Sequence, residues 1–205
     1  MLELFERAGI MMYPLTLASL IALAFIIERA LSLRKKKILI PEIISVVNNF
    51  STLKDIDLAR TICAKYDGPL SNVVKLGLQN HELPKAEIKE ILEDQGRQEV
   101  RKLERGLVVL ETIAAIAPLL GLLGTVLGMV EVFNVIKDQG IGQTAALSGG
   151  ISQALLTTVA GLFIGIPVLI AYNYFTNKSE SLILDIEKYT NELVNKIVHI
   201  KPQEE

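Results

Sequence analysis

The residues best suited to chemistry are hydroxyl and amide side chains inside two long apolar stretches. They are Thr125 in the first stretch, and Gln153, Thr157 and Thr158 in the second. Oxygens of this kind can solvate an ion or accept a hydrogen bond, as they do in channel linings. A threonine hydroxyl inside a helix often bonds only a carbonyl one turn back. An ion pathway and a purely structural role therefore both remain open for these residues.

Small residues share a face with these hydroxyls in both stretches. At 100° per residue, one face of the first stretch spans about 80° and one face of the second about 120°. Their members are Ala114, Ala117, Gly121, Gly124 and Gly128, with Thr125 at the shoulder, and then Gly150, Ala154, Thr157, Thr158, Gly161 and Gly165. Small residues four apart let helix backbones approach closely. The faces serve either packing within one subunit or the lining of a narrow shared interior, and Pro118 and Pro167 are expected to kink the two helices.

Neither stretch carries an ionisable side chain. Residues 112–130 and 139–177 contain no Asp, Glu, Lys, Arg or His. Glu111 and Glu131 flank the first stretch about 30 Å apart along a helix, so we interpret them as charges at the two membrane faces. A proton path needs an ionisable group inside the membrane. Proton conduction would therefore require a partner that supplies one.

Three uncharged stretches predict three transmembrane helices in an all-α membrane protein. The first, residues 8–27, has 20 residues, and the two described above have 19 and 39. About 20 apolar residues cross a hydrocarbon core of about 30 Å, so a soluble fold is disfavoured. A cleaved signal peptide is the alternative for the first stretch. The residues before it are net acidic and a run of basic residues follows it, which favours a retained anchor.

The basic residues predict the orientation. Residues 32–106 hold 14 of the 21 Lys and Arg, whereas the connection 137–147 and the N-terminal tail hold one each. Because basic segments near span ends stay cytoplasmic, the N-terminus is expected outside and the C-terminus inside. The chain then divides into an external tail with the first span (1–31), a cytoplasmic helical domain (32–106), two spans joined by a short external loop (107–177) and a cytoplasmic C-terminal helix (178–205).

The cytoplasmic parts are expected to form long helical extensions. Helices are predicted to begin at Pro41, near Asp55, at Pro69 and at Pro84, because proline suits the first helical position. With no clear breaker, the last is expected to continue into the second span as one helix over about 84–136. An apolar stripe predicts that the third span continues to about residue 201.

Enzyme chemistry is not indicated. The sequence lacks the GxxxxGK[ST] loop that binds nucleotide phosphates. His81 and His199 are solitary, no metal site or cofactor is expected, and Cys63 is a single cysteine in a reducing compartment, where no disulfide is expected. The basic residues near the membrane suit topology and anionic lipid headgroups, so nucleic-acid binding is not expected.

Two segments resemble a known family. Ala117-Pro118-Leu119-Leu120-Gly121-Leu122-Leu123-Gly124-Thr125-Val126 followed by Gly128-Met129 is similar to the second-span signature of the ExbB–TolQ–MotA proton-channel family. Gly150-Ile151-Ser152-Gln153-Ala154-Leu155, then Thr158, Gly161-Leu162 and Ile166-Pro167, is similar to its third-span signature. Order, spacing and three-span topology resemble the ExbB and TolQ branch, since a MotA-type chain would have four spans.

The resemblance implies a channel subunit of the bacterial inner membrane. It implies a homo-oligomer of five copies around the helices of a single-span ExbD- or TolR-type partner with a transmembrane Asp. Proton flow would then do mechanical work on a TonB- or TolA-type periplasmic protein, as in TonB-dependent uptake or Tol-Pal systems. Thr125 and Thr158 match the paired pore threonines, whereas Gln153 stands where the enteric ExbB type has a glutamate, so H⁺ and Na⁺ both remain candidates. The alternative is a non-conducting membrane scaffold that assembles partner helices.

Overall fold

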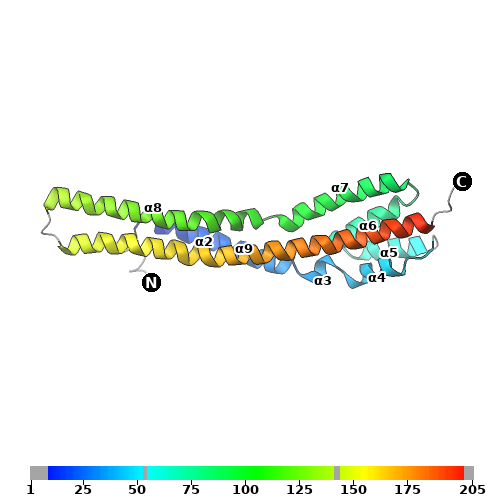
Figure 1. The fold of residues 1–205 in the computed structure, drawn as a ribbon. Helices are drawn as coiled ribbons and strands as arrows, with labels where there is room; N and C mark the ends of the chain where they lie inside the picture. Colours follow the sequence, from blue (N-terminus) through cyan, green and yellow to red (C-terminus); the bar gives the residue numbers. More distant parts are fainter. Residues whose placement is uncertain (1–8, 53–54, 141–143, 201–205) are drawn as a thin grey trace. The chain divides into compact units, whose positions relative to one another are not determined.

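The computed structural model describes residues 9–52, 55–140 and 144–200, and these residues form helices and no strand. In chain order the helices are α2 (Met12–Ser32), α3 (Lys35–Ile38), α4 (Pro41–Asn49), α5 (Ile56–Lys65), α6 (Pro69–Gln79), α7 (Lys85–Glu104), α8 (Leu107–Gln139) and α9 (Thr144–Ile200) (Figure 1). Three helical stretches, at α2, around α8 and within α9, are long and apolar enough to cross a membrane. The predicted all-α fold with three transmembrane helices is therefore confirmed.

Local sequence explains where the shorter helices begin. Pro41 and Pro69 occupy the first position of α4 and α6, and Pro84 directly precedes α7. Ahead of α5, the Asp55 carboxylate accepts hydrogen bonds from the Thr52 hydroxyl at 2.9 Å and from the Thr52 and Ser51 N–H groups at 2.9 and 3.3 Å. These bonds, led by the hydroxyl, stabilise the charged form and lower the pKa of Asp55. The four predicted starts are confirmed to within a residue.

The expected uninterrupted helix over 84–136 is wrong, because the chain breaks between α7 and α8. α7 ends at Glu104, and Gly106 adopts φ 85° and ψ −14°, a left-handed conformation that disfavours a side chain. The Phe25 ring fills the space where a Cβ of residue 106 would lie, 2.8 Å away. The glycine thus both ends α7 and admits a ring from α2. By contrast, α8 and α9 continue through Pro118 and Pro167, and the predicted kinks stay predictions.

The chain divides into two compact units. The first comprises Met1–Arg29 with Gly106–Tyr174, and the second Ala30–Arg105 with Phe175–Glu205. In the second unit α6 packs against α5 and α7, and the core is formed by buried residues of α4, α6, α7 and α9. These are Ile43, Val47, Leu70, Val73, Val74, Leu78, Ile88, Leu92 and Leu193. This unit holds every helix that the sequence assigns to the cytoplasm.

Polar contacts tie the second unit together. The buried Glu99 carboxylate accepts hydrogen bonds from Asn72 Nδ2 at 3.1 Å, Gln95 Nε2 at 2.9 Å and Lys102 Nζ at 2.9 Å. On α9, Lys196 Nζ donates to the carbonyls of Val47 and Asn48 at 2.9 and 2.6 Å. A lysine is favourable there because the last carbonyls of α4 lack helical partners.

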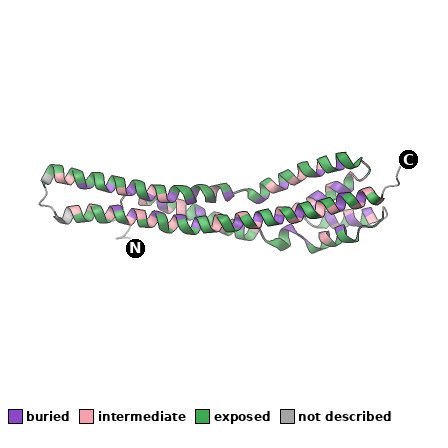
Figure 2. Cartoon of the chain, in the orientation of Figure 1, coloured by how far each residue is buried: buried purple, intermediate pink, exposed green. Residues whose placement is uncertain are grey.

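The first unit contains α2, α8 and the N-terminal part of α9. The buried residues of α2 are Leu15, Ala22 and Arg29, seven apart, so a narrow stripe faces the unit. On α8 and α9 a narrow buried stripe alternates with broad exposed apolar surface (Figure 2). Exposed apolar side chains such as Leu122, Val126 and Phe163 suit lipid or other protein chains, not water.

Candidate ion-pathway site

Glycines bring the backbones of α8 and α9 into direct contact. A Cβ built on Gly161 would lie 2.6 Å from the Ala117 carbonyl oxygen and 3.0 Å from the Gly121 Cα. A Cβ on Gly121 would lie 2.9 Å from the Thr157 carbonyl oxygen. No other residue type fits at these two positions without separating the helices. We call this contact the glycine seam.

The seam extends in both directions with one antiparallel register. Toward the loop that joins the helices, Gly128 lies against Ala154 and Gly150 against Val132. In the other direction Gly165 lies against Pro118, whose ring atoms come within 2.8 Å of a Cβ built on the glycine. Gly124 faces Thr157. The glycines singled out by the sequence thus lie between two helices of one chain.

Thr158 and Thr125 each bond a carbonyl in the same turn of α8. The Thr158 hydroxyl donates across the seam to the Gly121 carbonyl at 3.1 Å, and the Thr125 hydroxyl donates to the Leu122 carbonyl at 2.6 Å. The helical N–H partner of the Gly121 carbonyl is that of residue 125, so the two threonines flank the same peptide group. Both side chains are half-buried. Because each hydroxyl already donates its proton to a backbone carbonyl, each can interact with an ion or a partner only through its oxygen lone pairs.

Thr157 and Gln153 belong to a different place. Thr157 is 2% exposed and donates to the Ala154 carbonyl at 2.7 Å. With Gln153 it lines a cavity of about 160 Å³, whose other walls include Glu131 of α8 and Met11 ahead of α2. Thr125 and Thr158 do not line this cavity. The four residues of the predicted pathway therefore separate into two pairs, and their role in ion passage stays a prediction.

With this geometry, the chain can be compared with known proteins. Residues 65–188, from the end of α5 through α8 and into α9, match the MotA/TolQ/ExbB proton channel family. This chain belongs to that family. The match includes every residue of the glycine seam and both pairs described above.

Similar proteins carry ExbB names. The chain is 30% identical over 194 residues to a biopolymer transport protein ExbB homologue of Methanothermobacter thermautotrophicus, covering 93% of this chain and 69% of that protein. It is 33% identical over 149 residues to the biopolymer transport protein ExbB of Neisseria gonorrhoeae, covering 66% and 68%. It is 33% identical over 179 residues to an ExbB-like 1 biopolymer transport protein of Synechocystis sp., covering 84% and 69%. The predicted resemblance to this family is confirmed.

Sequence reasoning missed two residues beside the candidate pathway of this MotA/TolQ/ExbB family member. Glu131 was interpreted only as an interfacial charge, although it lines the same cavity as Gln153. Gly9, with φ 71°, lies so close to the Gln153 amide that a Cβ would clash with it. The spacing of Glu131, three residues after Gly128, was an available signal for the first. No sequence signal connected Gly9 with residue 153.

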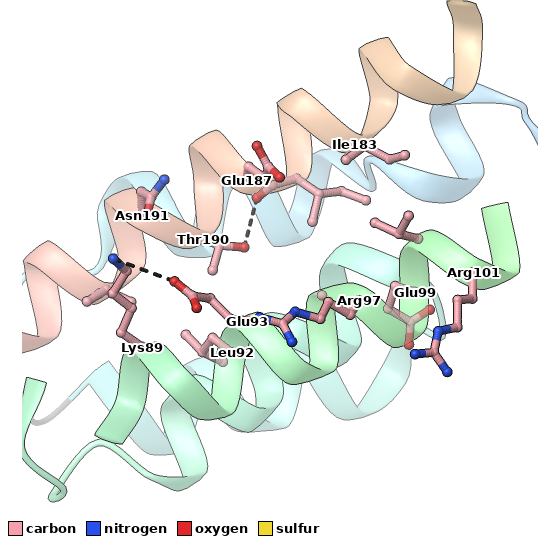
Figure 3. A pocket seen from close by; sticks show the side chains of 14 residues that line it. Lys89, Leu92, Glu93, Arg97, Glu99, Arg101, Ile183, Glu187, Thr190 and Asn191 are labelled. Carbon is pink, nitrogen blue, oxygen red and sulfur yellow. Dashed lines mark hydrogen bonds and ion pairs between the residues drawn. The ribbon is translucent and has the colours of Figure 1, made fainter. Parts of the chain in front are cut away.

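The described residues of the second unit of this chain form a hollow but no comparable site. It measures about 500 Å³ between α7 and the C-terminal part of α9, with charged side chains at its edge (Figure 3). Lys89 and Glu93 form an ion pair there at 3.5 Å. Among the described residues no group of three or more His, Cys, Asp or Glu could hold a metal ion. Cys63 is buried, and this burial raises the pKa of its thiol to about 11, which disfavours the reactive thiolate.

Proposed function

We propose that this chain is the ion-channel subunit of an inner-membrane motor complex that converts the proton-motive force into mechanical work on a periplasmic partner. The observation that carries the proposal is that the half-buried hydroxyls of Thr125 and Thr158 bond two successive carbonyls of α8, those of Leu122 and Gly121, which leaves their oxygen lone pairs available. Membership of a proton channel family supports the ion class. The energised system would be of the TonB-dependent or Tol-Pal kind.

Several copies of the chain are needed for a pathway. The seam is filled by glycine, alanine and threonine, so two helices of one chain leave no passage between them. The exposed apolar faces of α8 and α9 are available for neighbouring chains. We propose a homo-oligomer, a pentamer as the family resemblance implies, that surrounds a single-span ExbD- or TolR-type helix. The N-terminus would lie in the periplasm and the C-terminus in the cytoplasm.

The hydroxyl geometry suggests how a partner aspartate would be controlled. A protonated carboxylic acid can donate its O–H to the outward lone pairs of Thr125 and Thr158. An ionised carboxylate finds no donor there unless a threonine gives up its bond to a backbone carbonyl. Because hydrogen bonding to the neutral form disfavours the charged form, the threonines would raise the pKa of the aspartate while it faces them. Movement away from them would release the proton.

The test is a flux assay in proteoliposomes with a pH-sensitive dye. The chain alone is expected to give background leak, and the chain with its single-span partner gated proton flux. Thr125→Val and Thr158→Val keep the side-chain shape and remove the lone pairs, so flux should fall while the oligomer persists. Losing the bond from Thr158 costs only about 0.6–1 kcal/mol. Replacing the H⁺ gradient with a Na⁺ gradient identifies the coupling ion.

A non-conducting scaffold is the alternative function. It would use the same glycine seam and exposed apolar faces only to hold partner helices together. A scaffold predicts normal assembly and no gated flux with the partner present. Unchanged flux in both valine variants would instead remove the threonines from the pathway and leave them a packing role.

A further inference from the structure

A polar cavity in the second unit has no role in the function proposed above. Its volume is about 230 Å³, and its walls come from the end of α2, from α3, from the start of α6 and from the last turns of α7. At about 30 Å³ per water molecule, the cavity has room for about seven waters, or for a small polar group. Its polar lining consists of Ser32, Lys37, Asp67, Asn72, Glu99 and Lys102.

The Glu99 carboxylate at this cavity is buried but only partly satisfied. Asn72, Gln95 and Lys102 donate to Oε1 at 3.1, 2.9 and 2.9 Å, and no described residue donates to Oε2. Glu99 is 2% exposed. Asn72 and Lys102, which hold its carboxylate, line this cavity and not the hollow between α7 and α9. Because a buried carboxylate oxygen without a donor is costly, a donor from outside the chain is favoured here.

The charges around the cavity are of both signs. The carboxylates of Asp67 and Glu99 line it together with the ammonium groups of Lys37 and Lys102. The first turn of α6, which begins at Pro69, adds backbone N–H groups that lack helical partners and favour an anion. A ligand with one cationic and one anionic group therefore suits the cavity better than a simple cation or a simple anion.

Two walls of the cavity come from residues close to transmembrane helices. Ser32 is the last residue of α2, and Leu103 precedes α8, which begins at Leu107. At 1.5 Å per residue, both positions lie within about 10 Å of an apolar span along the chain. The headgroup region of a bilayer extends about 5–8 Å beyond the hydrocarbon core on each side. Phospholipid headgroups are therefore within reach of this cavity.

We infer that the cavity binds a phosphoethanolamine group, the headgroup of a phospholipid that carries a primary amine. The ammonium donates to Glu99 Oε2 and lies near Asp67, and the phosphate lies near Lys37 and the first turn of α6. A phosphatidylcholine headgroup has no N–H donor for Oε2. A phosphatidylglycerol headgroup brings only negative charge to two carboxylates. The inference does not depend on the ion pathway.

Lipid retention by the full chain tests the inference. The chain is released from nanodiscs of phosphatidylethanolamine, phosphatidylglycerol and phosphatidylcholine in equal amounts with the same acyl chains, and the retained lipids are measured by native mass spectrometry. Phosphatidylethanolamine is expected in excess over both others. Glu99→Gln replaces Oε2 with an NH₂ group while its amide oxygen can still accept the internal bonds. The excess should then fall about tenfold, as when a bond to a charged group is lost. The matched control is Glu104→Gln, an exposed carboxylate of α7 outside the cavity.

A second pair of variants tests the phosphate side without touching Glu99. Lys37→Gln should lower the retention of phosphatidylethanolamine about two- to fivefold, the range of an exposed ion pair. Lys36→Gln changes an exposed lysine of α3 that does not line the cavity, so it should retain the lipid as the unchanged chain does.

Glycerophosphoethanolamine, which has no acyl chains, distinguishes a lipid from a soluble ligand. If it displaces the retained lipid, the headgroup alone is recognised, and if it does not, the site is specific for the lipid in the membrane. Equal retention of the three phospholipids overturns the inference. Retention of phosphatidylethanolamine that both Glu99→Gln and Lys37→Gln leave unchanged also overturns it, because the lipid is then bound outside this cavity.

Discussion

Gly161→Ala tests the glycine seam most directly. A Cβ at residue 161 would meet only backbone atoms of α8: the Ala117 carbonyl oxygen at 2.6 Å, the Gly121 Cα at 3.0 Å and the Gly121 nitrogen at 3.1 Å. Ordinary contact begins at 3.4 Å, so the oxygen is about 0.8 Å too close. None of these atoms belongs to a side chain that could rotate away. The two helices must therefore separate locally.

The magnitude follows from three effects. Overpacking of this kind costs about 1–3 kcal/mol, and the rigid neighbours place this site at the upper end. Separation also lengthens the bond from Thr158 to the Gly121 carbonyl, which costs about 0.6–1 kcal/mol. The better helix propensity of alanine offsets about 1 kcal/mol. The net expectation is a loss of about 2–3 kcal/mol in the free energy of unfolding, or about 4–12 °C in Tm for a chain of this size.

Thermal unfolding of the purified chain in detergent measures this loss. The matched control is Gly149→Ala on the same helix, where nothing lies within 4 Å of the added Cβ, so its Tm is expected to be unchanged or slightly raised. If Gly161→Ala and Gly149→Ala have the same Tm, the glycines of the seam are not required for the close approach of α8 and α9.

Three further outcomes are expected. Native mass spectrometry in mild detergent should show a homo-oligomer, and a purely monomeric chain would contradict the assembly. An impermeant maleimide added outside cells should label Asp138→Cys and not Glu82→Cys, both of which are exposed positions; the reverse pattern inverts the proposed orientation. The native Cys63 should stay unlabelled in either case until the protein unfolds, because it is buried and its pKa is raised to about 11. Glu99→Ala should destabilise the second unit by about 1–3 kcal/mol in chemical denaturation, since it leaves the Asn72 and Gln95 amides without the carboxylate that accepts their hydrogen bonds, while the exposed Glu104→Ala should change stability by less than about 0.5 kcal/mol.

Much of the fold is local and could be predicted. Proline positions set the starts of α4, α6 and α7 because they act on the chain next to them. The break at Gly106 could not be predicted in this way, because it involves a contact with a residue far away in the sequence. A glycine within a helical pattern is often tolerated, and this one adopts a left-handed conformation after α7 with the Phe25 ring of α2 in the space of its missing Cβ.

The sequence by itself determined the three apolar stretches, the small-residue faces and the family. Each depends on composition or on spacing along one helix. The thickness of the hydrocarbon core relates the length of an apolar stretch to a transmembrane helix, and helical periodicity relates residue spacing to a shared face. Only the tertiary structure decided which residues meet between helices. The register of α8 against α9 brings the Thr158 hydroxyl to the Gly121 carbonyl and the Thr157 side chain to Gly124, and Gly9 lies against the Gln153 amide. Contacts of this kind depend on how whole helices pack, because a shift of one residue along the seam would replace every pair.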